Sequence, residues 1–493
     1  MSRSKFNLKL NLKLSSKVYN SKLFSPKLST TLLSTFALLS CVGLATNNAF
    51  AANSEQNAQV SQQGLPKNII MVVADGMGPA YTSAYRYFND DPSTAEIEQT
   101  VFERHLKGLS STYPAPVSGY VTDSAAGATA LATGVKSYNG AISVDVNKKP
   151  LLTVLEWAKQ QGKKTGVVVT SRINHATPAS YLSHNESRRN YDELANSYID
   201  NGIKADVYFG GGWTNYIRDD RNIVNEFKQA GFQYIDSYSQ LAGLENDKPV
   251  LGLFADFGLP WALDDSNKHR LAMMTKAATG QLKNDAGFFM LVEASQIDWG
   301  GHDNNIATAM HEMDDLAKLM EYLEVFVEKN PDTLVVLTAD HSTGGFTLAA
   351  NKEYRWDPEV LRTMVHSPAT IAKKIIAKDQ LNHKEINQWL NFELNTEEFQ
   401  HITEIDSSHQ QAKAQYLLLS ATEKTEKKAP ELKEFYRRAI LAIIDKRTNT
   451  GWTTSGHTGI DVPVFAFGKH SEQFSGQLDN TDIAKKIFTL LGK

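Results

Sequence analysis

The sequence predicts an α/β fold of three layers, α/β/α, with a mostly parallel central sheet and an inserted helical subdomain. Short apolar runs recur along the 493 residues, and their apolarity is continuous rather than alternating, which is typical of parallel strands buried on both faces. Segments with helical periodicity lie between these runs, which favours a doubly wound sheet. One long stretch, at about 351–450, carries no strong strand pattern and breaks the alternation.

Seven apolar runs are predicted to be buried strands, and two segments between them are predicted to be helices. The strands are NIIMVVAD (68–75), KTGVVVTS (164–171), DVYFGG (206–211), PVLGLFA (249–255), GFFMLVEAS (287–295), DTLVVLTAD (332–340) and VPVFAFG (462–468). The helices are 151–161 and 307–330. Residues 351–450 are rich in Lys, Glu, Gln and His and include TIAKKIIAKDQL and ELKEFYRRAILAII, so they predict the helical insertion.

The first 51 residues differ from the rest of the chain. They hold seven basic residues and no acidic one, followed by the apolar run LLSTFALLSCVGLA (32–45) and by AFA at 49–51. This pattern predicts a secretory signal peptide that is cleaved after Ala51, because the apolar run is short for a membrane span. An uncleaved anchor is the alternative; a lipoprotein modified at Cys41 fits less well, since Leu39 is a poor residue at its position. Residues 52–66 are predicted to be a flexible mature N-terminus, which leaves 67–493 for the folded domain.

Removal of this leader changes the charge and the cysteine content. The mature chain keeps 44 of the 51 Lys and Arg against all 55 Asp and Glu, a net charge of −11 instead of −4. Such an acidic protein is not expected to bind nucleic acid, which requires a basic surface. The single cysteine leaves with the leader, so a periplasmic or secreted product without disulfides must be stabilised by a large core, bound metal or oligomerisation.

Carboxylates and histidines gather where the predicted strands end. In open α/β sheets ligands bind beyond the carboxyl ends of the strands, and carboxylates crowded there repel one another unless cations lie among them. Each residue alone has an ordinary structural explanation, such as a turn aspartate or a surface histidine, but the set does not. Its members are Asp75, Glu293, Asp298, His302, Asp340, His341 and His457.

The residue types in this set indicate which ions would bind. Imidazole nitrogen and carboxylate oxygen without thiolate suit catalytic Zn²⁺. The spacing of Asp298 and His302 allows both side chains to reach one metal, and adjacent Asp340 and His341 can reach a second. Oxygen-only groups, such as Glu293 and a hydroxyl like that of Thr177, suit Mg²⁺.

A stretch of very small residues follows one serine in VTDSAAGATALATG (121–134). It offers little apolar surface for packing, but small residues let a backbone approach closely and a helix N-terminus attracts anions. Ser124 is therefore a candidate nucleophile toward a phosphate.

Taken together, these motifs resemble those of bacterial alkaline phosphatase. VTDSAAGAT, DGMG, TGVKSYNGAIS, ATPASYLSH, TADHSTGGF and SGHTG all have counterparts in that family, over roughly 68–346 and 452 to the end. The resemblance implies a phosphomonoesterase of broad substrate range, active at alkaline pH through a phosphoserine on Ser124, and a homodimer.

The resemblance also implies a set of ligands and contacts. Asp298, His302 and His457 would hold one zinc ion. Asp75, Asp340 and His341 would hold a second, with Ser124 at the metals and Asp75 bridging to a magnesium ion completed by Glu293 and Thr177. Arg188, rather than the adjacent Arg189, would clamp the substrate phosphate, with Asp123 orienting it.

Two positions depart from the enteric members of the family. NHATPA has His175 where those enzymes carry an acid, and IDWGG has Trp299 where they carry a lysine. Both residues resemble the pattern of marine bacterial members. His175 is expected near the magnesium site or the substrate phosphate, and the exchange leaves the identity of the third metal open.

Other functions remain to be compared with this one. A phosphodiesterase, nucleotide pyrophosphatase or phosphomutase would keep the two-metal core but lack the third-metal residues Thr177 and Glu293. A sulfatase would need a C-x-P-x-R context, which is absent from the sequence. A metal- or phosphate-binding protein without turnover is the non-enzyme alternative, and the 351–450 insertion could serve interaction, including the dimer.

Overall fold

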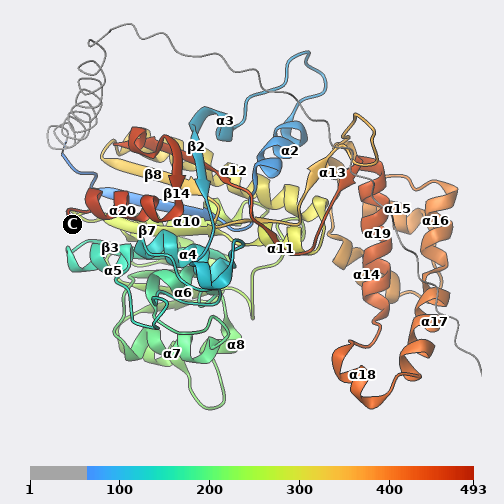
Figure 1. Ribbon diagram of the computed structural model, residues 1–493, viewed down its shortest axis with the longest axis horizontal. Coiled ribbons are helices and arrows are strands. Elements are labelled where there is room, and N and C mark those ends of the chain that lie inside the picture. The colour runs from blue at the N-terminus through green and yellow to red at the C-terminus, as the bar shows by residue number, and fades with distance from the viewer. Residues whose placement is uncertain (1–63) are drawn as a thin grey trace, which may run out of the picture. The chain divides into compact units, whose positions relative to one another are not determined.

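A ten-stranded sheet organises residues 64–493, the part of the chain that the computed structural model describes (Figure 1). Its strand order is β14-β2-β13-β8-β1-β7-β3-β4-β6-β5. Neighbouring strands are parallel except around β13, which runs antiparallel to both β8 and β2. The predicted mostly parallel sheet is therefore confirmed. The predicted leader lies outside the described residues, as do 52–63 of the predicted mature N-terminus.

All seven predicted strands occur, and three others were not predicted. The predicted ones are β1 (Asn68–Ala74), β3 (Lys164–Arg172), β4 (Val207–Gly211), β6 (Val250–Leu253), β7 (Phe288–Ala294), β8 (Thr333–Thr338) and β13 (Val462–Gly468). The others are β2 (Leu106–Ser111), β5 (Gln233–Ile235) and β14 (Gly476–Asp479). These three lie at or near the two edges of the sheet and are only partly buried, so their sequences lack the continuous apolar run that revealed the rest.

Helices cover both faces of the sheet, which gives the predicted three layers. One layer contains α2 (Pro79–Asn89), α10 (Arg270–Gln281) and α12 (Ile306–Lys329), with α3 (Val101–His105) beside α12. The other contains α4 (Ser124–Thr133), α5 (Val154–Gln160), α6 (Ala176–Leu182) and α20 (Asn480–Leu490). α7 (Tyr191–Asp200) packs against α8 (Trp213–Tyr216) and α9 (Ile223–Gln229). The two helices predicted from periodicity are α5 and α12.

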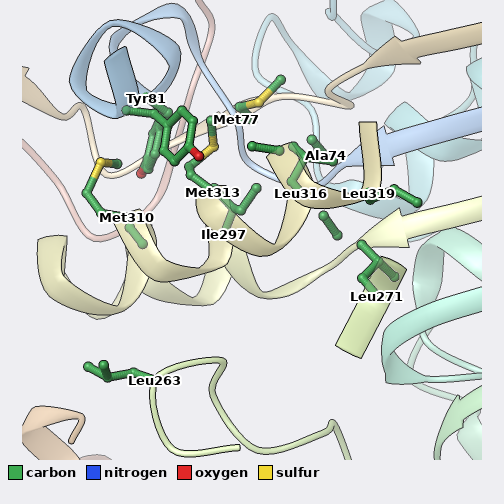
Figure 2. Packing of buried hydrophobic residues seen from close by; sticks show 14 of the residues in the cluster. Ala74, Met77, Tyr81, Leu263, Leu271, Ile297, Met310, Met313, Leu316 and Leu319 are labelled. Atoms are coloured by element: carbon green, nitrogen blue, oxygen red, sulfur yellow. The ribbon is translucent and has the colours of Figure 1, made fainter. Parts of the chain in front are cut away.

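The core between the sheet and α12 also anchors a short helix, α11 (Gln296–His302). Figure 2 shows Ile297 of α11 beside Met313 of α12 and Tyr81 of α2, and all three side chains are fully buried. Burial of a side chain of this size contributes roughly 1.5–3 kcal/mol. The packing therefore fixes the position of α11, whose neighbouring positions carry Asp298, Trp299 and His302.

The segment predicted as an insertion is helical. It contains α13 (Glu359–Thr363), α14 (Pro368–Ile376), α15 (His383–Leu390), α16 (Thr396–Thr403), α17 (Ile405–Leu417), α18 (Ala421–Glu426) and α19 (Leu432–Thr448), and α14–α19 gather at the right of Figure 1. The chain enters it from β10 (Thr347–Leu348) and leaves it through β11 (Thr450–Gly451), and these two strands pair with each other. The segment therefore begins and ends at one place. Among residues 64–493, no helix is both long and apolar enough to cross a membrane.

Candidate active site

Three neighbouring strands deliver carboxylates to one edge of the sheet. Asp75 follows β1, Asp340 lies two residues beyond β8, and Glu293 is the penultimate residue of β7. β8, β1 and β7 are adjacent and parallel, with Val73 of β1 opposite both Glu293 and Thr338, so their ends meet at one level. All three carboxylates are fully buried.

Ser124 begins α4 beside this edge. Asp123 caps the helix, because its Oδ1 accepts hydrogen bonds from the main-chain N–H groups of Ala126 and Gly140, each at 3.0 Å. Every residue of α4 is buried, and a Cβ added at Gly127 would lie 3.0 Å from the carbonyl oxygen of Asp340. The run of small residues thus lets the helix approach the end of β8. It leaves Ser124 Oγ 3.1 Å from His341 Nε2.

Asp298, His302 and His457 form the first cluster. His302 Nε2 lies 3.1 Å from His457 Nε2 and 3.3 Å from Asp298 Oδ2. Each histidine has its Nδ1 at a main-chain carbonyl, 2.6 Å from Ser455 O for His302 and 2.9 Å from Thr122 O for His457. Nδ1 must therefore carry the proton in a neutral ring, which leaves each Nε2 as a ligand atom. Without a metal, the hydrogen bond to Asp298 raises the pKa of His302 to about 9, so a proton on His302 Nε2 occupies the place between the two rings that a cation would take.

Asp75, Asp340 and His341 form the second cluster. His341 Nε2 lies 3.4 Å from Asp75 Oδ1 and 3.3 Å from Asp340 Oδ2. Burial, and the negative charge of Asp340, raise the pKa of Asp75 well above its usual range; burial and Asp298 do the same to the pKa of Asp340. The ring of His341 stacks on that of His457 at 3.6 Å between centroids, so the first two clusters are adjacent.

A third cluster surrounds the far side of Asp75. Asp75, Glu293 and His175 each offer a ligand atom, and these atoms lie within 4.8 Å of one another. Ser171 Oγ donates to one oxygen of Glu293 at 3.0 Å. Burial, with the positive charge of Arg188, lowers the pKa of His175 to about 3, so its ring is neutral and can act as a ligand.

Several buried polar atoms in these clusters have no hydrogen-bond partner. Buried polar groups normally find one, and an unpaired one costs about 1–3 kcal/mol. The unpartnered atoms belong to predicted ligands and to His175: Asp75 Oδ1 and Oδ2, Asp340 Oδ2, Glu293 Oε1, Thr177 Oγ1 and His175 Nδ1. The donor sets therefore fit cations, with nitrogen and oxygen in the first two clusters and mostly oxygen in the third.

Arg188 projects beside Ser124 from the loop that precedes α7. Its Nη1 donates to Asp123 Oδ2 at 3.1 Å, and its Nη2 lies 3.5 Å from His175 Nε2. The adjacent Arg189 also lines the open pocket here but makes no such contact with Asp123. The pocket has a volume of about 650 Å³ and is lined by Asp123, Asn139, Gly140, Glu186, Ser187, Arg188, Arg189, Tyr191, His302 and His457.

Trp299 packs against His175 of the third cluster and is not among the residues that line the pocket. Its ring meets those of His175 and Trp261 edge to face, at 5.9 and 6.2 Å between centroids. Gly258 is required beside it, because an added Cβ would lie 2.5 Å from the indole ring. Trp299 therefore borders the site through the ring of His175.

Sequence reasoning missed two residues that the geometry brings forward. Thr343 lies between two clusters, since its hydroxyl donates to Asp298 Oδ1 at 2.5 Å and lies 3.2 Å from His341 Nδ1. It was present within TADHSTGGF, but a threonine gives no metal-ligand signal of its own. Tyr191, three residues after Arg188, lines the pocket, and nothing in its sequence context distinguishes it from a core tyrosine.

Comparisons with known proteins agree over nearly the whole described chain. The family profile described as alkaline phosphatase matches residues 66–492. Alkaline phosphatase 3 of Bacillus subtilis is 43% identical over 457 residues, which cover 91% of this chain and 94% of that protein. The cold-active alkaline phosphatase of a psychrophilic Shewanella is 48% identical with a TM-score of 0.78, covering 86% of this chain and 100% of that one. The alkaline phosphatase of the Antarctic bacterium TAB5 is 27% identical with a TM-score of 0.62, covering 87% of this chain and 98% of that one.

Proposed function

The chain belongs to the alkaline phosphatase family of phosphoric monoester hydrolases, and on that premise we propose that it cleaves a broad range of phosphate monoesters at alkaline pH through a phosphoserine on Ser124. The observation that carries this proposal is the set of buried ligand atoms without hydrogen-bond partners in the second and third clusters, together with the Ser124 hydroxyl 3.1 Å from His341 of the second cluster. Such a centre suits phosphoryl transfer, which depends on charge neutralisation and in-line positioning.

Two zinc ions and one magnesium ion are the proposed cofactors. Asp298, His302 and His457 would hold the first zinc ion. Asp75, Asp340, His341 and Ser124 would hold the second. Asp75, Glu293 and Thr177 would hold magnesium, with His175 beside them. When bound, these ions lower the pKa of the serine hydroxyl and neutralise charge on the attacking and leaving oxygens. A histidine-to-glutamate variant of the TAB5 enzyme holds magnesium in a site named M3, which supports magnesium as a third ion in this fold.

The residues of the chain then perform two displacements at phosphorus. The fork of Arg188, held by Asp123, binds two phosphate oxygens, while the N-terminus of α4 adds partial positive charge. Ser124 releases its hydroxyl proton to water, and its Oγ attacks phosphorus as the bond to the alcohol oxygen breaks. The departing alkoxide takes up a proton from water and leaves as the alcohol. A water molecule next attacks the phosphoserine, so that phosphate leaves and Ser124 is restored.

Export and assembly form the second part of the proposal. Residues 1–51 would direct the chain to the periplasm or the medium and be removed, and 67–493 would form the enzyme domain with its insertion at about 351–450. We propose a homodimer of the mature chain, with the insertion as a candidate contact. Light scattering at micromolar concentration should give twice the mass of the mature chain; the mass of one chain would contradict the dimer.

The test uses purified residues 52–493 and hydrolysis of p-nitrophenyl phosphate against pH. We expect high activity at alkaline pH that is lost with EDTA and restored by zinc with magnesium, and a metal count of two zinc and one magnesium by mass spectrometry. Ser124→Ala should abolish turnover while retaining metal. Ser93→Ala is the matched control, because Ser93 is an exposed loop serine and its loss should have no effect.

Two outcomes would replace the proposal. Activity on a phosphodiester alone would place the protein with the diesterases of the same superfamily. Bound metal without hydrolysis of either ester would favour the metal- or phosphate-binding alternative.

A further inference from the structure

The pocket beside Ser124 contains one feature that phosphate binding does not explain. Its lining is otherwise made of charged, amide, small and imidazole groups, and among these described residues Tyr191 alone brings a six-membered carbon ring. The phosphate of a monoester would occupy the Arg188 end. Whatever the alcohol carries must therefore extend along the part of the pocket where Tyr191 lies.

The ring of Tyr191 is held from behind by a cation. Arg172 Cζ lies 3.9 Å from the centroid of the Tyr191 ring and 5.2 Å from the centroid of the Phe257 ring. Asn215 Oδ1 accepts a hydrogen bond from Arg172 Nη1 at 3.2 Å, which fixes the guanidinium. Arg172 is not part of the pocket lining. Arg172 therefore covers one face of the ring, while Tyr191 itself lines the pocket.

The main chain of Tyr191 is fixed as well. Asn174 Nδ2 donates to the carbonyl oxygen of Tyr191 at 2.9 Å, from the loop that follows β3. Tyr191 is also the first residue of α7, three residues after Arg188. The ring thus lies at a set position relative to the phosphate clamp, and a rigid ring can bind a partner with little loss of conformational entropy.

We propose that Tyr191 is a stacking platform for the leaving group, so that the enzyme favours monoesters whose alcohol carries a flat aromatic group, such as nucleoside monophosphates. This inference rests on the proposed phosphomonoesterase function. Bases stack on aromatic side chains whatever their sequence, and one such contact corresponds to about five- to 150-fold in binding. Arg172 supports the ring of Tyr191 from its other face.

The test compares two esters with the same reacting oxygen. Adenosine 5′-monophosphate and ribose 5-phosphate both carry phosphate on the ribose C5 oxygen and differ at C1 in having adenine or a hydroxyl. We expect the metal-loaded wild type to show a kcat/KM ratio of about fivefold or more in favour of the nucleotide. Tyr191→Leu should bring that ratio to within about twofold of unity, and Tyr191→Phe should preserve it.

The ratio cancels any general loss of folding or activity in a variant. Tyr113→Leu is the matched control, because Lys136 Nζ lies 3.8 Å from the Tyr113 ring centroid and this tyrosine is outside the pocket lining. Its ratio should equal that of the wild type. A wild-type ratio near unity, or a ratio unchanged in Tyr191→Leu, would overturn the platform alone. Failure of the wild type to release phosphate from either ester would overturn the proposed function, and the platform with it.

Discussion

Thr343→Val removes one hydroxyl from between the first two clusters. Thr343 is fully buried, and its Oγ1 donates to Asp298 Oδ1 at 2.5 Å while lying 3.2 Å from His341 Nδ1. Because the hydroxyl hydrogen of Thr343 is used in the bond to Asp298, its oxygen is left to accept a hydrogen bond from the Nδ1–H group of His341. This chain of hydrogen bonds holds the proton on Nδ1 and leaves Nε2 of His341 available to a metal.

The size of the effect follows from what the substitution leaves unpaired. Valine has nearly the same shape but cannot hydrogen-bond, so a buried Nδ1–H loses its acceptor at a cost of about 1–3 kcal/mol. A hydrogen bond to the charged Asp298, worth about 1.5–3 kcal/mol, is lost as well. Mutation of a residue that orients a metal ligand typically lowers the metal affinity 10- to 100-fold, which corresponds to about 1.4–2.7 kcal/mol. We therefore expect zinc to bind 10- to 100-fold more weakly.

Dialysis against graded zinc buffers, followed by metal counting and p-nitrophenyl phosphate hydrolysis, measures this loss. Activity of Thr343→Val should fall at low free zinc and return at saturating zinc, and Thr343→Ser should behave as the wild type. Thr338→Val is the control for stability, since that buried hydroxyl donates to main-chain carbonyl oxygens, to that of Pro463 at 3.0 Å, and not to a proposed ligand side chain. Unchanged zinc affinity in Thr343→Val, or an activity loss that zinc does not restore, would refute the reasoning.

Three further predictions concern pH, metal and packing. Burial raises the pKa of Asp445 to about 7, from about 3.9 in an unfolded chain, so the free energy of unfolding falls as pH rises from about 4 to 7. Asp445→Asn keeps an acceptor for Trp452 Nε1 and should raise the melting temperature at pH 8 with little change at pH 4; an equal shift at both would contradict this. Chelation should lower the melting temperature more at pH 9 than at pH 5. The pKa values of Asp75 and Asp340 are raised in the metal-free protein, so ionisation of these buried groups destabilises the fold as pH rises. Scanning calorimetry of chelated and metal-loaded samples checks the sign. Gly127→Ala should lower kcat/KM, because its Cβ would lie 3.0 Å from the carbonyl oxygen of Asp340 and push the end of β8 away; wild-type kinetics would show that the helix can yield.

The central part of the fold could be predicted because its strands are buried on both faces. β1, β7 and β8 are continuous apolar runs, and nearly all of their residues are buried. The edge strands could not be predicted in the same way. β14 reads GQLD and is mostly exposed, and β2 pairs antiparallel with β13, an arrangement that depends on partners far away in the sequence.

The part of the candidate site that could be predicted consists of residues whose side chains are common metal ligands. Carboxylates and histidines at strand ends predict a metal site, and the structure brings Asp75, Asp340 and His341 together. The residues that contact these side chains have no residue type or spacing that indicates their position. Thr343 contacts Asp298, and Arg172 contacts the ring of Tyr191. Both contacts join residues that are well separated in the sequence, so they form only when the chain folds. The positions of Thr343 and Arg172 relative to the site can therefore be found only from the structure.

The first cluster joins parts of the chain that are far apart in the sequence. His457 Nδ1 meets the carbonyl oxygen of Thr122 across 335 residues, and its strand β12 (His457–Thr458) pairs with β9 (Ser342–Thr343). Contacts of such long range slow folding, because a large loop must close before any of them forms. A nascent chain that stops short of residue 457 already holds Ser124 and most of the proposed ligands, but it lacks His457 of the first cluster. On the proposed ligand set, we therefore expect such an incomplete chain to be inactive rather than partly active.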